Sequence, residues 1–112
     1  MADVYDCAHR LAKALRHSDE HQAYLDAQKK IHGDERSIKL INQYRQKQME
    51  LHAKQLAGET LTDDDHQSVS QLREVLELKP EIREFLQCEA RLIQLMSDIQ
   101  GILSESVDLD FE

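Results

Sequence analysis

The sequence predicts an all-α protein, an elongated antiparallel helical hairpin or bundle of about five helices, two of them long. Aromatic residues make up only 4% of the chain, and there are three Gly and one Pro. Sandwiches and barrels need many turns and many aromatic or β-branched strand residues. Apolar residues also recur at helical spacing along most of the chain. The 112 residues suit one domain, expected over residues 1–104 and followed by an acidic tail over residues 105–112.

Capping residues divide the first third of the chain into two helices. Asp3 is a suitable N-cap for a first helix over residues 4–17, and Ser18 is a suitable N-cap for a second. Gly33 is expected to end the second helix, because glycine readily adopts the left-handed conformation that follows many helices. The apolar stripes are Val4, Ala8, Leu11 and Leu15 in the first helix and Tyr24, Ala27 and Ile31 in the second.

Similar signals delimit a third and a fourth helix. Asp34 and Gly58 bound the third helix, which is expected over residues 35–57. Thr62 caps the fourth helix, and the acidic run of residues 63–65 fills its first turn. The positive end of the helix dipole favours carboxylates at this position, which explains the run more simply than a metal cluster does.

The fifth helix is expected to begin at Pro80 and to extend to about Leu103. Proline suits the first helical position, whereas the residue before it avoids helical geometry. Gly101 lies inside this helix and indicates either fraying, the favoured interpretation, or the close approach of another backbone. The candidate core or oligomer seam follows helical spacing and comprises Ile82, Phe85, Leu86, Glu89, Leu92, Ile93, Met96, Ile99 and Leu103.

Helix length predicts self-association. The third and fifth helices, of about 23 residues each, would be roughly 35 Å long, whereas a compact domain of this size has a radius of gyration of about 13 Å. The two rods are therefore expected to form an elongated hairpin that the shorter helices cover only in part. Because an exposed apolar stripe usually marks an interface, we expect a homo-oligomer, most simply a two-fold dimer.

Glu89 is the one charged residue of the candidate seam. A buried carboxylate without a hydrogen-bond donor is costly, so Arg45, His52 or a residue of another subunit is a candidate partner. Two interpretations remain open. Glu89 either reaches water at the rim of the bundle or fixes the register or oligomeric state at some cost in stability.

Charge and motifs argue against several classes of function. The net charge of −8 disfavours nucleic-acid binding, because phosphate contacts need an excess of Lys and Arg. No apolar run reaches the roughly 20 residues of a membrane span, and the first ten residues do not form a signal peptide, which predicts a cytoplasmic protein. Because no catalytic or metal-ligand motif is present, we expect no enzyme, no cofactor and no metal site.

Charge is also distributed unevenly along the chain. Residues 1–57 contain ten basic and eight acidic residues, a net charge of +2, whereas residues 58–112 contain four and fourteen, a net charge of −10. The simpler interpretation is solvated helix faces with an acidic tail. The alternative is an acidic surface that selects a basic partner or orients an assembly.

The sulfur-containing residues of the helices are assigned to the core. Cys7 and Cys88 are isolated and lie at helical spacing, which is typical of small buried hydrophobic residues. Met49 and Met96 are expected to fill gaps in the core rather than to form a docking surface.

Four stretches carry a resemblance to a known family. They are VYDCAHRLAKALRHSDE, DERSIKLINQYRQKQMEL, KQLAGETLTDDD and LQCEARLIQLMSDIQGIL. Over about residues 3–103 the chain resembles the YlbF/YmcA family of small helical bacterial proteins, most closely its YheA-like branch. The resemblance implies a self-associating, cytosolic, all-α protein without enzymatic activity. Characterised members act with partner proteins on competence, sporulation and biofilm formation, through an RNA-maturation complex that involves a ribonuclease.

The resemblance also implies iron–sulfur clusters, which one branch binds through cysteines. The chain departs from that branch, because Cys7 and Cys88 could supply only half of a four-cysteine site.

Three functions are therefore compared. The leading one is a protein-interaction and regulatory module that acts as a helical oligomer and binds itself and other regulatory proteins, without a membrane. The alternative is an iron–sulfur or metal-binding regulatory subunit of an RNA-maturation complex. Direct RNA binding ranks last, because aromatic stacking residues are scarce and the net charge is negative. Its candidate residues are Lys29, Lys30, Arg36, Lys39, Arg45 and Lys47.

Overall fold

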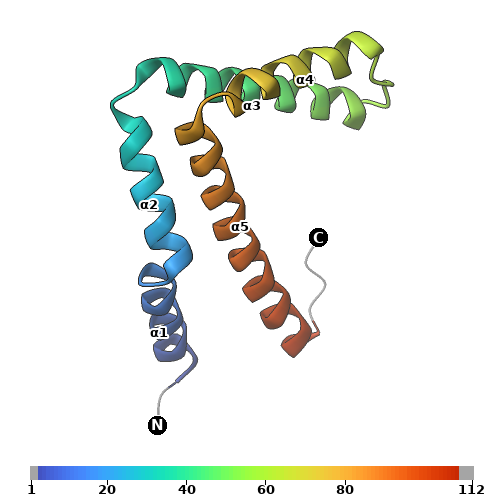
Figure 1. The fold of residues 1–112 in the computed structure, drawn as a ribbon. Coiled ribbons are helices and arrows are strands. Elements are labelled where there is room, and N and C mark those ends of the chain that lie inside the picture. The colour runs from blue at the N-terminus through green and yellow to red at the C-terminus, as the bar shows by residue number, and fades with distance from the viewer. Residues whose placement is uncertain (1–2, 109–112) are drawn as a thin grey trace. The chain divides into compact units, whose positions relative to one another are not determined.

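The structure, a computed structural model, describes residues 3–108 and consists of five helices (Figure 1). They are α1 (Val4–Arg16), α2 (Asp19–His32), α3 (Glu35–Leu56), α4 (Asp63–Glu77) and α5 (Pro80–Val107). Residues 3–108 contain no strand, and the all-α prediction is confirmed. The two long helices are α3 and α5, with 22 and 28 residues.

The chain forms two compact units. Within the described residues, unit 1 comprises residues 3–28 and 85–108, with α1, most of α2 and most of α5. Unit 2 comprises residues 29–84 and contains α3 and α4. The division of the chain into a domain over residues 1–104 and an acidic tail stays a prediction, and residues 109–112 of that tail lie outside the described residues.

Side-chain caps begin the helices at the predicted positions. Asp3, Asp34 and Thr62 each accept a hydrogen bond from the backbone N–H three residues later, at 2.8, 3.3 and 3.1 Å. Ser18 has the same role in front of α2, because its Oγ accepts a hydrogen bond from the N–H of His21 at 3.2 Å. Each cap satisfies a donor that the first helical turn leaves without an intrahelical partner. The predicted helix starts are therefore confirmed.

Gly58 terminates α3, as predicted. Its φ of 84° lies in the left-handed region, which glycine adopts without the steric cost that other residues incur. The N–H of Gly58 donates to the carbonyl oxygen of Gln55 at 3.1 Å, and the N–H of Glu59 donates to that of Lys54 at 3.0 Å. These two bonds satisfy carbonyl groups at the end of α3 and reverse the direction of the chain.

The second half of α5 differs from its prediction. The helix continues through Gly101 and ends at Val107, about one turn beyond the expected end at Leu103. The helix does not fray at Gly101, and no other backbone of the same chain comes close, because a Cβ atom there would meet nothing within 4 Å. One glycine costs about 1 kcal/mol relative to alanine, which a long helix tolerates because its propagation is cooperative.

Within unit 2, α3 and α4 pack as an antiparallel helical hairpin (Figure 1). The loop over residues 57–62 joins them, and short loops place consecutive helices antiparallel. Helix length predicts that the two long helices form the rods of the hairpin, whereas in unit 2 the long helix α3 pairs with the shorter α4. The buried residues of unit 2 are Ile31, Ser37, Ile41, Tyr44, Leu51, Asp65, Leu76 and Ile82.

The buried part of unit 1 lies where α2 meets α5. Ala27, Phe85 and Cys88 are its buried residues within the described part of the chain. The ring of Tyr24 lies against the ring of Phe85, with centroids 5.4 Å apart and planes tilted by 37°. α1 contributes no buried residue. The core of unit 1 is therefore small and leaves α1 and the second half of α5, residues 92–107, partly uncovered.

Candidate protein-interaction surface

α1 presents an apolar face that the rest of unit 1 covers only in part. Val4 and the adjacent Tyr5 are 81% and 77% exposed. Leu11 and Leu15, which continue the stripe of Val4 at helical spacing, are half-buried. Such an amphipathic helix normally buries its apolar face against another element. α1 is therefore a candidate contact surface.

α5 carries an apolar arc that is wider than one neighbour covers. With 3.6 residues per turn, the apolar positions of residues 92–107 span roughly 180° around the helix. One side of the arc is half-buried within unit 1 and consists of Leu92, Leu95 and Ile99, with the exposed Ile102 next to Leu95. The opposite edge is exposed and has 3,4 spacing, with Gln100 at one position. We call its apolar residues the α5 stripe, which comprises Ile93, Met96, Leu103 and Val107.

The structure divides the predicted seam into three groups. The buried residues are Ile82 and Phe85, near the start of α5. The half-buried residues are Leu86, Glu89, Leu92 and Ile99. The exposed residues are Ile93, Met96 and Leu103. The predicted seam omits two exposed residues: Ile102, which lies outside the helical spacing of the seam, and Val107, which lies beyond the expected helix end at Leu103. The function of this seam in an oligomer stays a prediction.

Three side chains that were expected in the core are exposed. Met49 on α3 is 73% exposed and Met96 on α5 is 50% exposed. Cys7 is exposed on α1, where Nη2 of Arg10 donates to its Sγ at 3.6 Å. Cys88 is buried, as expected. Helical spacing identifies apolar positions, but it does not show how completely neighbouring elements cover them.

Cys88 lines a small recess of unit 1 with a volume of about 280 Å³. The other lining residues are Asp19, Glu20 and Ala23 of α2 and Arg91 of α5. This lining combines carboxylates with a guanidinium group, so opposite charges lie around the thiol.

The cysteines of one chain do not fit an iron–sulfur cluster. Four thiolates usually hold such a cluster, whereas the chain has two cysteines, of which Cys7 is exposed and Cys88 is buried. Across residues 3–108, no group of three or more His, Cys, Asp or Glu side chains is placed to hold a metal ion. The iron–sulfur alternative therefore has no complete ligand set in this part of one chain.

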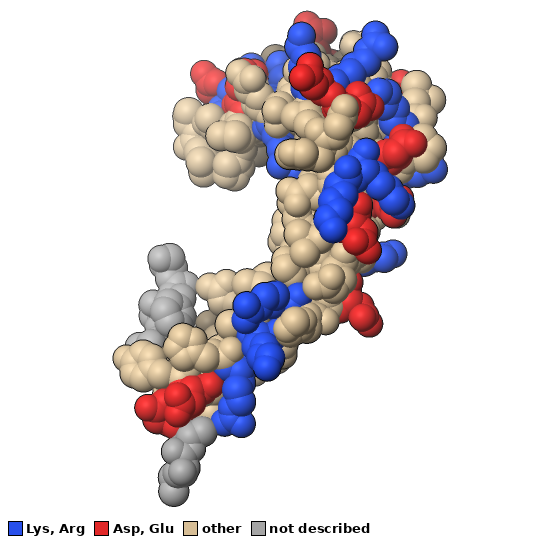
Figure 2. Space-filling model, turned by 90° about the vertical axis from the view of Figure 1, so that its left-hand side faces the viewer, with Lys and Arg blue, Asp and Glu red and all other residues tan. Residues whose placement is uncertain are grey.

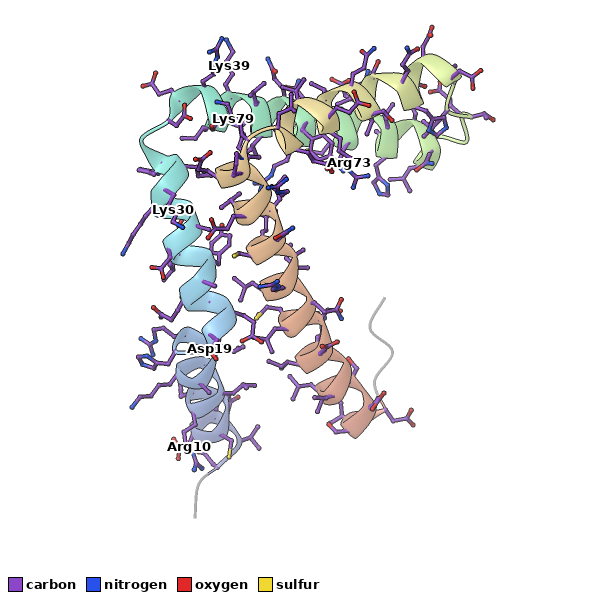
Figure 3. All side chains as sticks on the ribbon, in the orientation of Figure 1. Arg10, Asp19, Lys30, Lys39, Arg73 and Lys79 are labelled. Atoms are coloured by element: carbon purple, nitrogen blue, oxygen red, sulfur yellow. The ribbon has the colours of Figure 1, made fainter. Side chains whose placement is uncertain are left out.

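Lys79 joins the start of α3 to the junction between α4 and α5 (Figure 3). Its Nζ lies 3.6 Å from Oδ2 of Asp34 and donates to Oγ of Ser37 at 3.4 Å. Ser37 in turn donates to Oδ2 of Asp34 at 2.7 Å. The hydrogen bonds from Ser37, and after them the charge of Lys79, lower the pKa of Asp34. Because Asp34 is the N-cap of α3, this cluster has a structural role.

Asp65, the last residue of the acidic run at the start of α4, has a structural role there. Its buried carboxylate accepts hydrogen bonds from the backbone N–H of Thr62 at 3.0 Å and from Nζ of Lys54 at 3.2 Å. These bonds, with that from Thr62 first, lower the pKa of Asp65. Thr62 accepts a hydrogen bond from the N–H of Asp65 in return, so the two residues form a capping box.

An open groove of about 500 Å³ lies between the end of α3 and the start of α4. His52 of α3 and His66 of α4 contribute imidazoles to its lining, and Leu51, Leu61 and Val69 contribute apolar surface. No carboxylate, ammonium or guanidinium group lines it. The groove therefore offers hydrogen-bonding and apolar contacts without a charged group that would select an ionic ligand.

Charged side chains of both signs are mixed on the face of the protein that Figure 2 shows. Figure 2 shows Lys and Arg interspersed with Asp and Glu on one face, with uncharged surface between them. Within residues 3–108, no helix is long and apolar enough to cross a membrane.

Comparison with known proteins identifies the family of the chain. The family described as "Control of competence regulator ComK, YlbF/YmcA" matches residues 4–108. A UPF0342 protein of Caldicellulosiruptor saccharolyticus is 38% identical over 112 residues, which are 100% of this chain and 93% of the relative. A UPF0342 protein of Staphylococcus epidermidis is 33% identical over 106 residues, which are 95% of this chain and 93% of the relative.

A solved structure has the same fold. The protein of unknown function (DUF964) from Bacillus stearothermophilus has a TM-score of 0.79 at 19% sequence identity, with 94% of this chain and 92% of that chain covered. At this identity the likeness shows the fold alone. The family match and the two relatives together show that the chain belongs to the YlbF/YmcA family.

Proposed function

We propose that this protein is a non-enzymatic interaction module that acts as a helical oligomer and binds other regulatory proteins. Self-association takes place through the unit 1 apolar surface, which we define by the large apolar side chains of α1 and α5 that are at least half exposed. They are Val4, Tyr5, Ile93, Met96, Ile102, Leu103 and Val107. Their exposure is the observation that carries the proposal, because monomeric soluble proteins rarely expose large apolar patches.

Burial of the unit 1 apolar surface supplies the driving force for association. Complete burial of one large apolar side chain is worth about 1.5–3 kcal/mol. Since these seven side chains are at least half exposed, each contributes on the order of 1 kcal/mol. A two-fold interface buries the surface of both copies, which brings the gain to on the order of 10 kcal/mol. That gain is comparable with the cost of association, about 4–15 kcal/mol.

Two further observations support an interaction module rather than an enzyme. The family description refers to the control of a competence regulator, which is a regulatory role. Within residues 3–108, the two carboxyl groups with lowered pKa values, Asp34 and Asp65, both take part in helix capping. Perturbed pKa values often mark catalytic groups, but here a structural role accounts for them.

Light scattering after size-exclusion chromatography tests the proposal. The wild type is expected to have twice the 13.0 kDa mass of one chain at micromolar concentration. Met96→Glu places a charge on the unit 1 apolar surface and is expected to give a monomer. Met49→Glu is the matched control, because Met49 is exposed in unit 2, and it should keep the mass of the wild type. Circular dichroism establishes that both variants remain helical.

Two results would contradict the proposal. A wild type that stays at 13.0 kDa would show that the unit 1 apolar surface does not drive self-association. A dimer that Met96→Glu leaves unchanged would place the interface elsewhere on the molecule.

A further inference from the structure

Met96 differs chemically from the other side chains of the unit 1 apolar surface. The other side chains are aliphatic or phenolic, whereas Met96 carries a thioether. Oxidation of a thioether to a sulfoxide converts a flexible apolar side chain into a polar one, and reductases reverse the reaction. Met96 is therefore the position at which a mild oxidant changes the polarity of this surface.

Met96 also lies in the interior of the α5 stripe. Ile93 precedes it by nearly one helical turn, and Leu103 follows it after about two turns. The side chains of Ile93 and Leu103 carry no hydrogen-bond donor. When two copies associate through this surface, a sulfoxide oxygen at Met96 loses its contact with water, and burial of an unpaired polar group is costly.

An oxidant in solution reaches Met96 in a single copy. Met96 is 50% exposed, whereas association through the unit 1 apolar surface covers it in both copies of a two-fold dimer. Oxidation therefore takes place on free copies and removes them from the equilibrium between monomer and dimer.

We infer that oxidation of Met96 by a hydroperoxide switches self-association off, and that reduction of the sulfoxide switches it on again. The inference rests on the proposed self-association of unit 1. In the forward step with hydrogen peroxide, the sulfur attacks one peroxide oxygen and loses two electrons, the O–O bond breaks, an S–O bond forms, and water leaves. In the reverse step, two thiol groups of a methionine sulfoxide reductase supply two electrons and become a disulfide, and the oxygen leaves as water.

Met49 provides a comparison within the same chain. It is 73% exposed and lies in unit 2, outside the unit 1 apolar surface. Where about nine tenths of the copies are paired, oxidation of Met96 should be about tenfold slower than in a dilute sample, because only the free copies react. Oxidation of Met49 should keep its rate. Mass spectrometry of proteolytic peptides measures both rates, and a rate for Met96 that does not depend on concentration would overturn the inference.

Light scattering of the full-length Cys7→Ser variant tests the switch itself, since the exposed Cys7 also reacts with peroxide. Hydrogen peroxide is added and then removed, and the mass is measured over a dilution series. We expect the dissociation constant of the dimer to rise by at least about tenfold. Methionine sulfoxide reductases A and B, one for each sulfoxide epimer, should restore the original value. Circular dichroism should show that the oxidised protein remains helical.

Two further variants in the Cys7→Ser background assign the effect to one sulfur atom. Met96→Leu conserves the volume of the side chain and should remain a dimer after peroxide treatment. Met49→Leu is the matched control and should dissociate as the Cys7→Ser protein does. Dissociation of the Met96→Leu dimer by peroxide would overturn the inference, because another group would then respond to the oxidant.

Two other results would also overturn it. One is a dimer that persists although Met96 is oxidised, which would show that the sulfoxide finds a donor in the assembly, such as the amide of Gln100. The other is a loss of helix on oxidation. If the untreated protein stays at 13.0 kDa, the proposed self-association fails, and the inference fails with it. The two failures are thus distinguishable.

Discussion

In unit 2 the apolar faces of α3 and α4 cover each other, whereas in unit 1 the apolar faces of α1 and of the second half of α5 stay partly exposed. Both units are built from amphipathic helices. Unit 2 buries six apolar side chains together with Ser37 and Asp65, and unit 1 buries three apolar side chains within the described residues. The difference lies in how each apolar face obtains a neighbour.

In unit 2 the residues of the loop between α3 and α4 place the two helices next to each other. Gly58 reverses the chain, and the capping box of Thr62 and Asp65 starts α4 immediately afterwards. Lys54 then joins α3 to α4 through its contact with Asp65. α1 and the second half of α5 are far apart in the sequence, and no comparable turn joins them. This difference supports the proposal that unit 1 receives its missing neighbour from a second copy.

The largest expected effect distinguishes a buried isoleucine of unit 2 from an exposed isoleucine of unit 1. Ile82 is 0% exposed and Ile102 is 65% exposed. Ile82→Ala is expected to lower the free energy of unfolding by about 2–5 kcal/mol, because it removes buried methyl groups and leaves a cavity. Ile102→Ala should change it by less than about 0.5 kcal/mol in a dilute, monomeric sample. Urea denaturation measures both values.

The effect of Ile102→Ala on the free energy of unfolding should also depend on protein concentration, unlike that of Ile82→Ala. If a second copy covers unit 1, the effect of Ile102→Ala should grow with protein concentration, because the side chain is then buried in the assembly. An effect of Ile102→Ala that equals that of Ile82→Ala in the dilute sample would contradict the difference between the units.

Replacing Gly58 and Gly101 by alanine should change the stability of the protein in opposite directions. Gly58 has a φ of 84°, so Gly58→Ala is expected to destabilise the protein by about 1–2 kcal/mol. Gly101 lies in a helix where a Cβ atom would meet nothing within 4 Å, so Gly101→Ala should stabilise the dilute protein by up to about 1 kcal/mol. Thermal denaturation followed by circular dichroism measures the two shifts. Shifts of the same sign would contradict this account of the two glycines.

The helices and their starts were predictable because their signals are local. Asp34, Thr62 and Pro80 lie next to the apolar runs that they introduce, and each stands at the predicted helix start. The relevant hydrogen bonds form within a few residues of the cap, so no tertiary information is needed.

The coverage of the apolar positions was not predictable. Ile82 and Met96 belong to one regular pattern, but the first is buried and the second is 50% exposed. Periodicity gives the direction of a side chain around its helix, whereas exposure depends on which elements pack there. The pairing of α3 with α4 follows from the loop after Gly58, because short loops place consecutive helices antiparallel.

Asp65 should make the stability of unit 2 depend on pH. Its hydrogen bonds lower its pKa below the ordinary value of 3.8, so its contribution to stability is full above that value and is lost as the pH falls through the folded-state pKa. We expect the acid-induced loss of stability to be smaller in Asp65→Asn than in the wild type. Some loss should remain, because the pKa of Asp34 is lowered as well.

Urea denaturation at a series of pH values around 3.8 measures this dependence. Asp63→Asn is the matched control, because Asp63 is exposed in the same turn of α4. It should keep the pH dependence of the wild type. Identical curves for Asp65→Asn and the wild type would show that the capping box does not contribute.

The smallest expected effect concerns Glu89, which is half-buried on α5. If this carboxylate fixes the register of an assembly, Glu89→Leu should broaden the distribution of oligomeric masses without unfolding the protein. Native mass spectrometry measures the distribution, and urea denaturation measures the free energy of unfolding. If neither changes, the carboxylate does not fix the register, and the interpretation of Glu89 as a residue at the rim remains.

The mass of the wild-type protein in solution tests the central claim most directly. Light scattering over a dilution series is expected to give twice 13.0 kDa at micromolar concentration and to fall toward 13.0 kDa on dilution, because a second copy supplies the neighbours that unit 1 lacks. A constant mass of 13.0 kDa at every concentration would contradict that claim.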